Sequence, residues 1–296
     1  MRFLLLLACC CLPAVSIAKL NVFACEPEWA DLTQQLGGGL VNVFQATTAR
    51  QDAHHIQARP SLIARMRKAD LLVCSGADLE VGWLPLLIRS ASNKKVLTGG
   101  SGYFEAAEQV ERLEMSEFVD RSGGDIHAKG NPHVHLDPKK LLQIAEKLSI
   151  RLQKIDFANA SDYVDKFKVF ESNWLAAMAR WESKVGALKG KPVFVHHTSF
   201  SYFVDWLGLK VVGDLEPKPG LPPTTGHLSR LIRTAEQEKP IATLVGVYRS
   251  EKSAKWLEGK TGVKSLHLAY TVGGAKDANS LIALYDSMLT KLLNEL

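Results

Sequence analysis

Six of the nine histidines of this chain fall in three tight groups, and such groups are the feature of the sequence best suited to metal chemistry. A lone histidine is usually a surface or satisfied core residue, but each group here lies just past an expected strand or in a loop that enters a helix. Neutral imidazoles suit Zn²⁺ or another borderline transition metal, whereas Mg²⁺ and Ca²⁺ require oxygen ligands. One histidine from each group would complete a three-imidazole site. The groups are His54 with His55, His133 with His135, and His196 with His197.

In the two groups of adjacent histidines the sequence favours one ligand and one neighbour. The side chains of adjacent residues point in different directions, so each His-His pair contributes a single ligand. His133 and His135 are two residues apart, and in an extended segment their side chains lie on the same face. Two interpretations stay open for that group: both histidines bind, or one binds and the other supports it.

Short apolar runs alternate with amphipathic stretches twice along the chain, which is typical of βα units on a parallel sheet. Helices are expected between the strands, for example over 60–69, 79–91 and 227–239. Ligands of such sheets bind at the carboxyl ends of the strands. The expected strands cover 20–25, 38–45, 69–76 and 94–100 in the first half, and 191–197, 209–215, 241–248 and 264–270 in the second.

A long stretch without helix breakers separates the two halves. Residues 160–185 predict a helix of about 40 Å, longer than a small domain is wide. We expect it to act as a rigid connector between two Rossmann-like α/β lobes, each a parallel sheet flanked by helices, with the metal in the cleft between them. The predicted organisation is an N-terminal lobe over 19–158, a connecting helix over 159–188 and a C-terminal lobe over 189–296.

The first eighteen residues, MRFLLLLACCCLPAVSIA, predict a signal peptide. Its apolar run is too short for a membrane span, which needs about 20 apolar residues, and its end satisfies the small-x-small rule for cleavage before Lys19. We therefore expect a soluble protein exported to the periplasm. The stretch that ends at Cys9 resembles a lipobox with an unusually short apolar core, so lipid anchoring is the less favoured alternative.

Composition limits the remaining choices. Removal of the signal peptide leaves two cysteines, Cys25 and Cys74, and two thiols in an oxidising compartment suggest one disulfide. The formal net charge of the whole chain is +5, and its charges are spread without a basic run. Nucleic acid is therefore not an expected partner.

Four segments resemble, in order and spacing, the periplasmic zinc-binding proteins of metal ABC importers. The resemblance covers essentially the whole chain after the signal peptide, and its last two blocks together are specific. It implies two α/β lobes joined by a rigid helix, with the metal between them. The segments are DAHHIQARP at 52–60, ADLLVCSGADLE at 69–80, GNPHVHLDP at 130–138 and HTSFSYF at 197–203.

The resemblance also implies the ligands. His54 stands six places before a proline, His133 follows the proline of the N-P-H block, and His197 opens the H-x-x-F-x-Y-F block, as the three ligands of the family do. A glutamate at the last position marks the manganese and iron branch, so a histidine favours Zn²⁺ as the transported ligand. His135 stands where the family usually has Trp, which implies a supporting or cleft-wall role.

Two departures from the family concern the metal. The family commonly supplies an aspartate as fourth ligand, and Tyr270 stands at that position here. A water, Glu28, His127 or Asp277 could take its place, although His127 lies in a glycine-bearing loop and is expected to be solvated. The His- and acid-rich loop of many members is also missing. The family's strand order would make the strand ends that carry Cys25 and Cys74 neighbours, which favours a disulfide between them over free thiols or zinc thiolates.

The functional expectation is a carrier and not an enzyme. A secreted zinc hydrolase also uses three ligands with an open position, but its usual H-E-x-x-H motif is missing, as is a G-x-S-x-G elbow. We expect a monomer that captures Zn²⁺ and delivers it to an ABC permease. A manganese carrier of the same family and a surface adhesin on the same scaffold are the alternatives.

Overall fold

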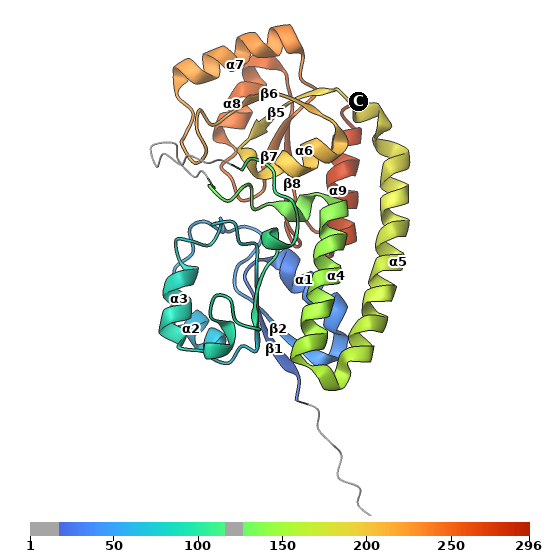
Figure 1. Cartoon of the computed structure of the whole chain (residues 1–296). Coiled ribbons are helices and arrows are strands. Elements are labelled where there is room, and N and C mark those ends of the chain that lie inside the picture. The colour runs from blue at the N-terminus through green and yellow to red at the C-terminus, as the bar shows by residue number, and fades with distance from the viewer. Residues whose placement is uncertain (1–17, 116–126) are drawn as a thin grey trace, which may run out of the picture.

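The structure is a computed structural model that describes residues 18–115 and 127–296. The expected signal peptide lies outside the described residues except for its last residue. Two α/β lobes are stacked, and one long helix runs along the side of both (Figure 1). No helix of the described part is both long and apolar enough to cross a bilayer.

The first lobe is built on a four-stranded, all-parallel sheet of order β2-β1-β3-β4. Its strands are apolar on both faces near the centre, as expected for a parallel sheet covered by helices; β3 is buried at every position. The strands are β1 (Leu20–Ala24), β2 (Val41–Gln45), β3 (Leu71–Cys74) and β4 (Tyr103–Glu105), and the helices are α1 (Pro27–Gly37), α2 (Pro60–Arg67), α3 (Leu84–Ala91) and α4 (Pro138–Ile155).

The second lobe repeats this plan with a parallel sheet of order β6-β5-β7-β8. In both sheets the first strand of the lobe lies at the centre, so the chain reverses its winding direction beside it, where ligands of such sheets bind. The elements are β5 (Pro192–His196), α6 (Ser201–Leu207), β6 (Lys210–Asp214), α7 (Thr225–Glu238), β7 (Thr243–Gly246), α8 (Lys252–Thr261), β8 (Ser265–Leu268) and α9 (Leu281–Leu293).

The strand expected over 94–100 is wrong. Residues Lys94–Val96 form a short 3₁₀ turn instead, because the Asn93 side chain accepts a hydrogen bond from the backbone N–H of Lys95 and begins a turn. Strand β4 starts only after Gly102, whose backbone lies so close to Asp70 that no side chain would fit there. The sheet therefore has its fourth strand, but a few residues later than the apolar pattern predicts.

The long helix is α5 (Ala160–Val185), whose 26 residues give a length of about 39 Å. It packs against α4 of the first lobe and against α9 of the second. The indole N–H of Trp174 donates to the carbonyl oxygen of Pro138 at 2.9 Å, and that of Trp181 donates to Asp286 at 2.7 Å. The expected connecting helix is confirmed, and it is fixed to an element of each lobe by a buried aromatic side chain.

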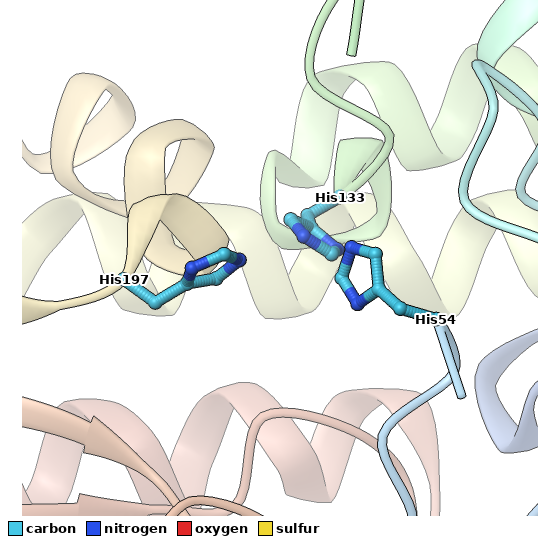
Figure 2. Close-up of side chains that lie close together, drawn as sticks. All are labelled: His54, His133 and His197. Carbon is cyan, nitrogen blue, oxygen red and sulfur yellow. The ribbon is translucent and has the colours of Figure 1, made fainter. Parts of the chain in front are cut away.

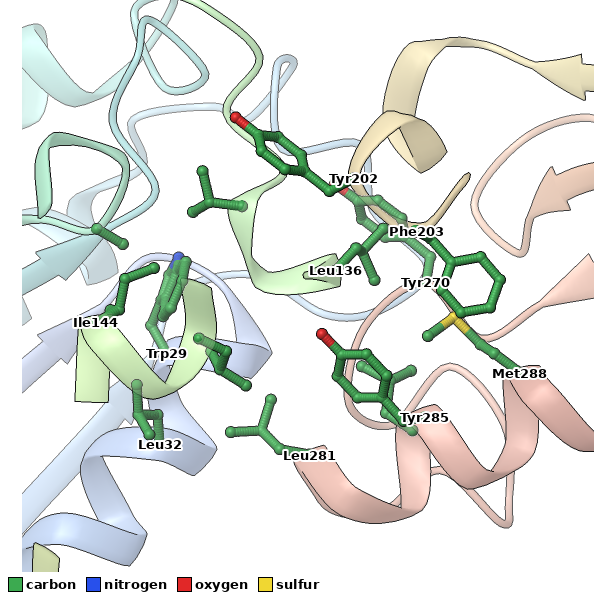
Figure 3. Close-up of a cluster of buried hydrophobic side chains, with 14 of the residues drawn as sticks. Trp29, Leu32, Leu136, Ile144, Tyr202, Phe203, Tyr270, Leu281, Tyr285 and Met288 are labelled. Atoms are coloured by element: carbon green, nitrogen blue, oxygen red, sulfur yellow. The ribbon is translucent and has the colours of Figure 1, made fainter. Parts of the chain in front are cut away.

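One hydrophobic core continues from the first lobe into the second (Figure 3). Trp29 and Ile144 contribute to it from one side, and Phe203 and Tyr285 from the other. Hydrogen bonds cross between the lobes in the same region: the Tyr285 hydroxyl donates to the carbonyl oxygen of His135 at 2.7 Å, and the Tyr202 hydroxyl donates to that of Asn131 at 2.8 Å. This continuous core restricts how far the lobes can separate.

Candidate metal centre

Three histidines from distant parts of the chain meet between the lobes. His54 lies in the loop between β2 and α2, His133 lies just before the turn that leads into α4, and His197 directly follows β5. One ring nitrogen of each lies within 4.8 Å of those of the other two, and the rings point toward one another (Figure 2). The sequence-predicted ligands are therefore the ones that the fold brings together.

Carboxylates fix the tautomer of two of these histidines. His54 Nδ1 lies 2.6 Å from Asp52 Oδ1, and His197 Nδ1 lies 2.8 Å from Glu216 Oε2. A carboxylate can only accept, so each imidazole carries its proton on Nδ1 and keeps a lone pair on Nε2. Metal-binding histidines in proteins are oriented in this way, by a hydrogen bond from the ring nitrogen that does not bind the ion.

A phenol takes the corresponding position beside the third histidine. The Tyr270 hydroxyl oxygen lies 2.6 Å from His133 Nδ1. When that nitrogen carries the proton, the phenol oxygen accepts it and Nε2 is free to bind a metal. Burial, with the positive charge of His54 and His197 when these are protonated, lowers the pKa of His133 well below its usual value, which favours the neutral form that metals require.

The size and chemistry of the site fit a small transition-metal ion. His133 Nε2 and His197 Nε2 are buried without a hydrogen-bond partner. Each of these two histidines is 1% exposed, and an unpaired buried polar atom costs free energy unless something binds it. Ligands 2.0–2.1 Å from a common zinc in a tetrahedral arrangement would lie about 3.4 Å apart. The three nitrogens lie within 4.8 Å of one another, so their separations need to shrink by at most about 1.4 Å to bind such an ion.

His127 is closer to this centre than its sequence suggests. Its Nε2 lies 3.1 Å from His54 Nε2, and its ring centroid lies 6.5 Å from that of His133. The expectation of a solvated loop residue is wrong, because His127 is half-buried and its ring centroid lies 5.2 Å from that of His54. His127 is therefore a fourth imidazole close to the three that converge.

The other candidates for a fourth ligand lie elsewhere. Glu28 faces His135, with 3.3 Å between Glu28 Oε1 and His135 Nδ1, and its second oxygen accepts from Thr271. His135 Nε2 is bonded to the backbone oxygen of Tyr270 at 3.0 Å, so both ring nitrogens of His135 face protein groups. Asp277 is exposed. Glu28 and His135 therefore form a buried pair behind the centre.

The loops that carry the ligands are held by specific backbone contacts. His197 has a backbone φ of 86°, which is uncommon for a residue other than glycine, and its N–H donates to Asp214 Oδ1 at 3.0 Å. The same oxygen accepts the N–H of Glu216 at 2.8 Å. On the other side, the indole N–H of Trp83 donates to the carbonyl oxygen of Ala53 beside His54. Strain of this kind persists where surrounding contacts impose it, often at functional sites.

Sequence reasoning missed the charged residues that surround the histidines. Arg249 Nη1 lies 3.3 Å from Glu216 Oε1 and 3.8 Å from Asp52 Oδ2. Burial would raise the pKa of each carboxyl group, but the hydrogen-bonded histidine and Arg249 lower both below their usual values. Asp52 could have been found from its position two residues before His54. Glu216 is 19 residues from His197, so only the fold reveals that pair.

The expected disulfide is present between Cys25 and Cys74, at the carboxyl ends of β1 and β3.

Two buried carboxyl groups lie beside these strand ends. Glu80 accepts the N–H of Ser75 at 2.8 Å, and Glu26 is 4% exposed. Burial raises the pKa of Glu80 to about 8 and that of Glu26 well above its usual value.

Two parallel-sheet lobes, one long helix and converging histidines together define the class of substrate-binding proteins that serve metal ABC importers. Within that class, the chain belongs to the family described as "Zinc-uptake complex component A periplasmic" (ZnuA), whose profile matches residues 22–296. The members are binding components of transport systems and not enzymes.

Curated relatives differ in the metal that their names give. The zinc-binding lipoprotein AdcA of Streptococcus pneumoniae R6 is 24% identical over 258 residues, which cover 83% of this chain and 49% of AdcA. The manganese ABC transporter substrate-binding lipoprotein ScaA of Streptococcus gordonii is 27% identical over 158 residues, which cover 52% of this chain and 48% of ScaA. The chain spans about half the length of these two relatives.

Solved structures share the fold. A crystal structure of ZnuA has a TM-score of 0.79 at 20% identity and covers 94% of this chain and 99% of its own. A manganese-bound periplasmic metal-binding protein from Candidatus Liberibacter asiaticus has a TM-score of 0.75 at 18% identity and covers 94% of this chain and 100% of its own. At such identities the likeness establishes the two-lobe architecture alone.

Proposed function

We propose that this protein captures Zn²⁺ between its lobes and delivers it, as a monomer, to the membrane permease of an ABC importer. The observation that carries the proposal is the convergence of His54, His133 and His197, each with Nδ1 held by a hydrogen-bond partner and Nε2 directed at the others. The ligands come from both lobes, which suits a site that closes around an ion and opens to release it.

The donor set favours zinc over manganese. The three side chains that converge on the centre all offer imidazole nitrogens. Mn²⁺ prefers carboxylate and carbonyl oxygens, whereas imidazole suits Zn²⁺, Cu²⁺ and Ni²⁺. Tyr270 replaces the anionic ligand that the resemblance leads one to expect. The charge of the ion is offset from behind the ligands instead, by Asp52 and Glu216. ScaA is named for manganese, so a manganese carrier is the rival within the family.

His127 completes this proposed site as a fourth donor. Its Nε2 is already beside His54 Nε2, and a tetrahedral zinc needs four ligands. A water at the fourth position is the alternative.

Single substitutions test the ligand assignment. His133→Ala and His197→Ala each remove one buried nitrogen and should abolish stoichiometric zinc binding in equilibrium dialysis while circular dichroism shows an intact fold. His55→Ala is the matched control, because His55 is adjacent to a proposed ligand but exposed. Tight binding that survives in both variants would refute the assignment.

We also propose that residues 1–18 direct export, so that the protein works outside the cytoplasm. AdcA and ScaA are named lipoproteins, which raises the weight of the lipobox alternative at Cys9. N-terminal analysis of the protein from the membrane and soluble fractions separates the two routes. A chain that begins at Lys19 indicates signal-peptide cleavage and a soluble protein, and a lipid-modified Cys9 indicates anchoring.

A further inference from the structure

Arg249 joins the two lobes beside the proposed metal centre. It lies in the loop after β7 of the second lobe, and its side chain is 15% exposed. Its Nη1 contacts Glu216 of its own lobe at 3.3 Å and Asp52 of the first lobe at 3.8 Å. The two carboxylates that it contacts are the ones that orient His197 and His54.

We propose that Arg249, with Asp52 and Glu216, forms an interlobe latch that slows the release of bound metal. This inference rests on the proposed function. Arg249 acts through the carboxylates and is a positioning residue and not a ligand. The latch links one proposed ligand of each lobe through a continuous chain: His54, Asp52, Arg249, Glu216 and His197.

The positions of the three residues determine which contact breaks when the lobes open. When the lobes separate, Arg249 keeps Glu216, because both belong to the second lobe, and loses Asp52. A charged pair that is partly desolvated is stronger than the same pair in water, so its loss opposes opening. Bound zinc makes the Nδ1 protons of His54 and His197 more acidic and strengthens their bonds to the carboxylates. Metal binding and the closed latch therefore stabilise each other.

The positive charge of Arg249 could also speed the release of zinc, and this opposite effect makes the proposal testable. The guanidinium carries a positive charge close to a site that binds a cation, and like charges repel. If this repulsion dominated, removal of the charge would tighten zinc binding. The latch predicts faster release on removal of the charge, because one contact that opposes opening of the lobes is lost.

The rate of zinc release shows whether the Arg249 charge slows release, as the latch predicts, or speeds it by repulsion. Zinc-loaded protein is mixed with an excess of chelator in a stopped-flow instrument, and Arg249→Met is compared with wild type, since methionine keeps most of the length without the charge. We expect the release rate to rise about tenfold or more, as for other groups that orient ligands, with the association rate unchanged. Arg249→Lys keeps the positive charge and should release zinc at a rate between those of wild type and Arg249→Met. Arg233→Met, at an exposed position of α7 in the same lobe, is the matched control and should release zinc as wild type does.

A double-mutant cycle separates a latch from general stabilisation. Asp52→Asn should also speed release, and Arg249→Met should add little in that background, because both substitutions break the same contact. Release from Arg249→Met at the wild-type rate or slower, or effects that add fully with Asp52→Asn, would overturn the latch while leaving zinc binding in place. A wild-type protein that binds no zinc would refute the proposed function itself, and the latch with it.

Discussion

The hydroxyl oxygen of Tyr270 lies 2.6 Å from Nδ1 of His133, although 137 residues separate them along the chain. Tyr270 stands where the resemblance places an aspartate ligand, and in this protein it contacts a proposed ligand and not the position of the ion. Its own backbone has a φ of 52°, and its ring centroid lies 5.5 Å from that of His133. The position therefore contributes to the site by orienting an imidazole.

Tyr270→Phe tests this role. The substitution removes the hydroxyl and leaves the buried ring, so the fold should be unchanged. Loss of a group that orients a ligand costs about 10–100-fold in metal affinity, and we expect zinc binding to weaken by this amount in competition with a fluorescent chelator. Tyr163→Phe, which removes a hydroxyl that donates to Asp156 far from the site, is the control. Unchanged affinity in Tyr270→Phe would show that the hydrogen bond does not orient the ligand.

His127→Ala tests the fourth donor. Loss of a fourth imidazole should weaken zinc binding while one ion per chain is still bound, because the other three histidines remain. X-ray absorption of the zinc-loaded protein should show four nitrogen neighbours in wild type, and three with one oxygen in the variant. If neither protein shows four nitrogen neighbours and both bind zinc with equal affinity, the fourth position belongs to water.

Glu80 should make the stability of the metal-free protein depend on pH. Burial raises its pKa to about 8 in the folded protein, whereas the unfolded chain ionises near 4.3. Between these values the unfolded state loses a proton that the folded state keeps. The free energy of unfolding therefore falls as the pH rises from about 4.5 to about 8.

Glu80→Gln keeps the shape and the acceptor for the N–H of Ser75 without the charge. Denaturant unfolding in the presence of chelator, followed from pH 5 to pH 8, should show a flatter profile in this variant than in wild type. Glu146→Gln on the exposed face of α4 should retain the wild-type slope. Identical slopes in all three proteins would contradict the assignment of the pH dependence to Glu80.

The disulfide should stabilise the first lobe. Cys25 and Cys74 are 49 residues apart, and a cross-link of this kind restricts the unfolded chain, which typically contributes about 2–4 kcal/mol. The Cys25→Ala, Cys74→Ala double variant should lose this much free energy of unfolding in denaturant titrations of metal-free protein. A loss below about 1 kcal/mol would mean that the bridge adds little to the folded state beyond its packing.

The sequence predicts the lobes and the connecting helix because local patterns determine them. Buried parallel strands read as short apolar runs, and the helix over Ala160–Val185 reads as an unbroken stretch. The three histidine groups stand out in the sequence, but the choice of one proposed ligand within each group came from the resemblance to the metal-binding family. The prediction of a strand over 94–100 failed because contacts outside the apolar pattern determine the conformation of that segment. These are the hydrogen bond to the side chain of Asn93 and the close approach of Gly102 to Asp70.

The surroundings of the ligands could not be predicted in the same way. Asp52, Glu216 and Arg249 are ordinary charged loop residues in the sequence, and only the meeting of three loops from two lobes makes them a network. His127 was misjudged because a glycine-bearing loop usually lies in solvent. The contact between Tyr270 and His133 joins the two lobes, and no local pattern encodes it.

The most direct test of the proposed function is the metal content of the protein purified without chelator, followed by competitive titration of zinc and manganese into the stripped protein. The proposed site predicts one tightly held zinc per chain that manganese does not displace. No bound metal, or a clear preference for manganese, would contradict a centre built from histidine nitrogens.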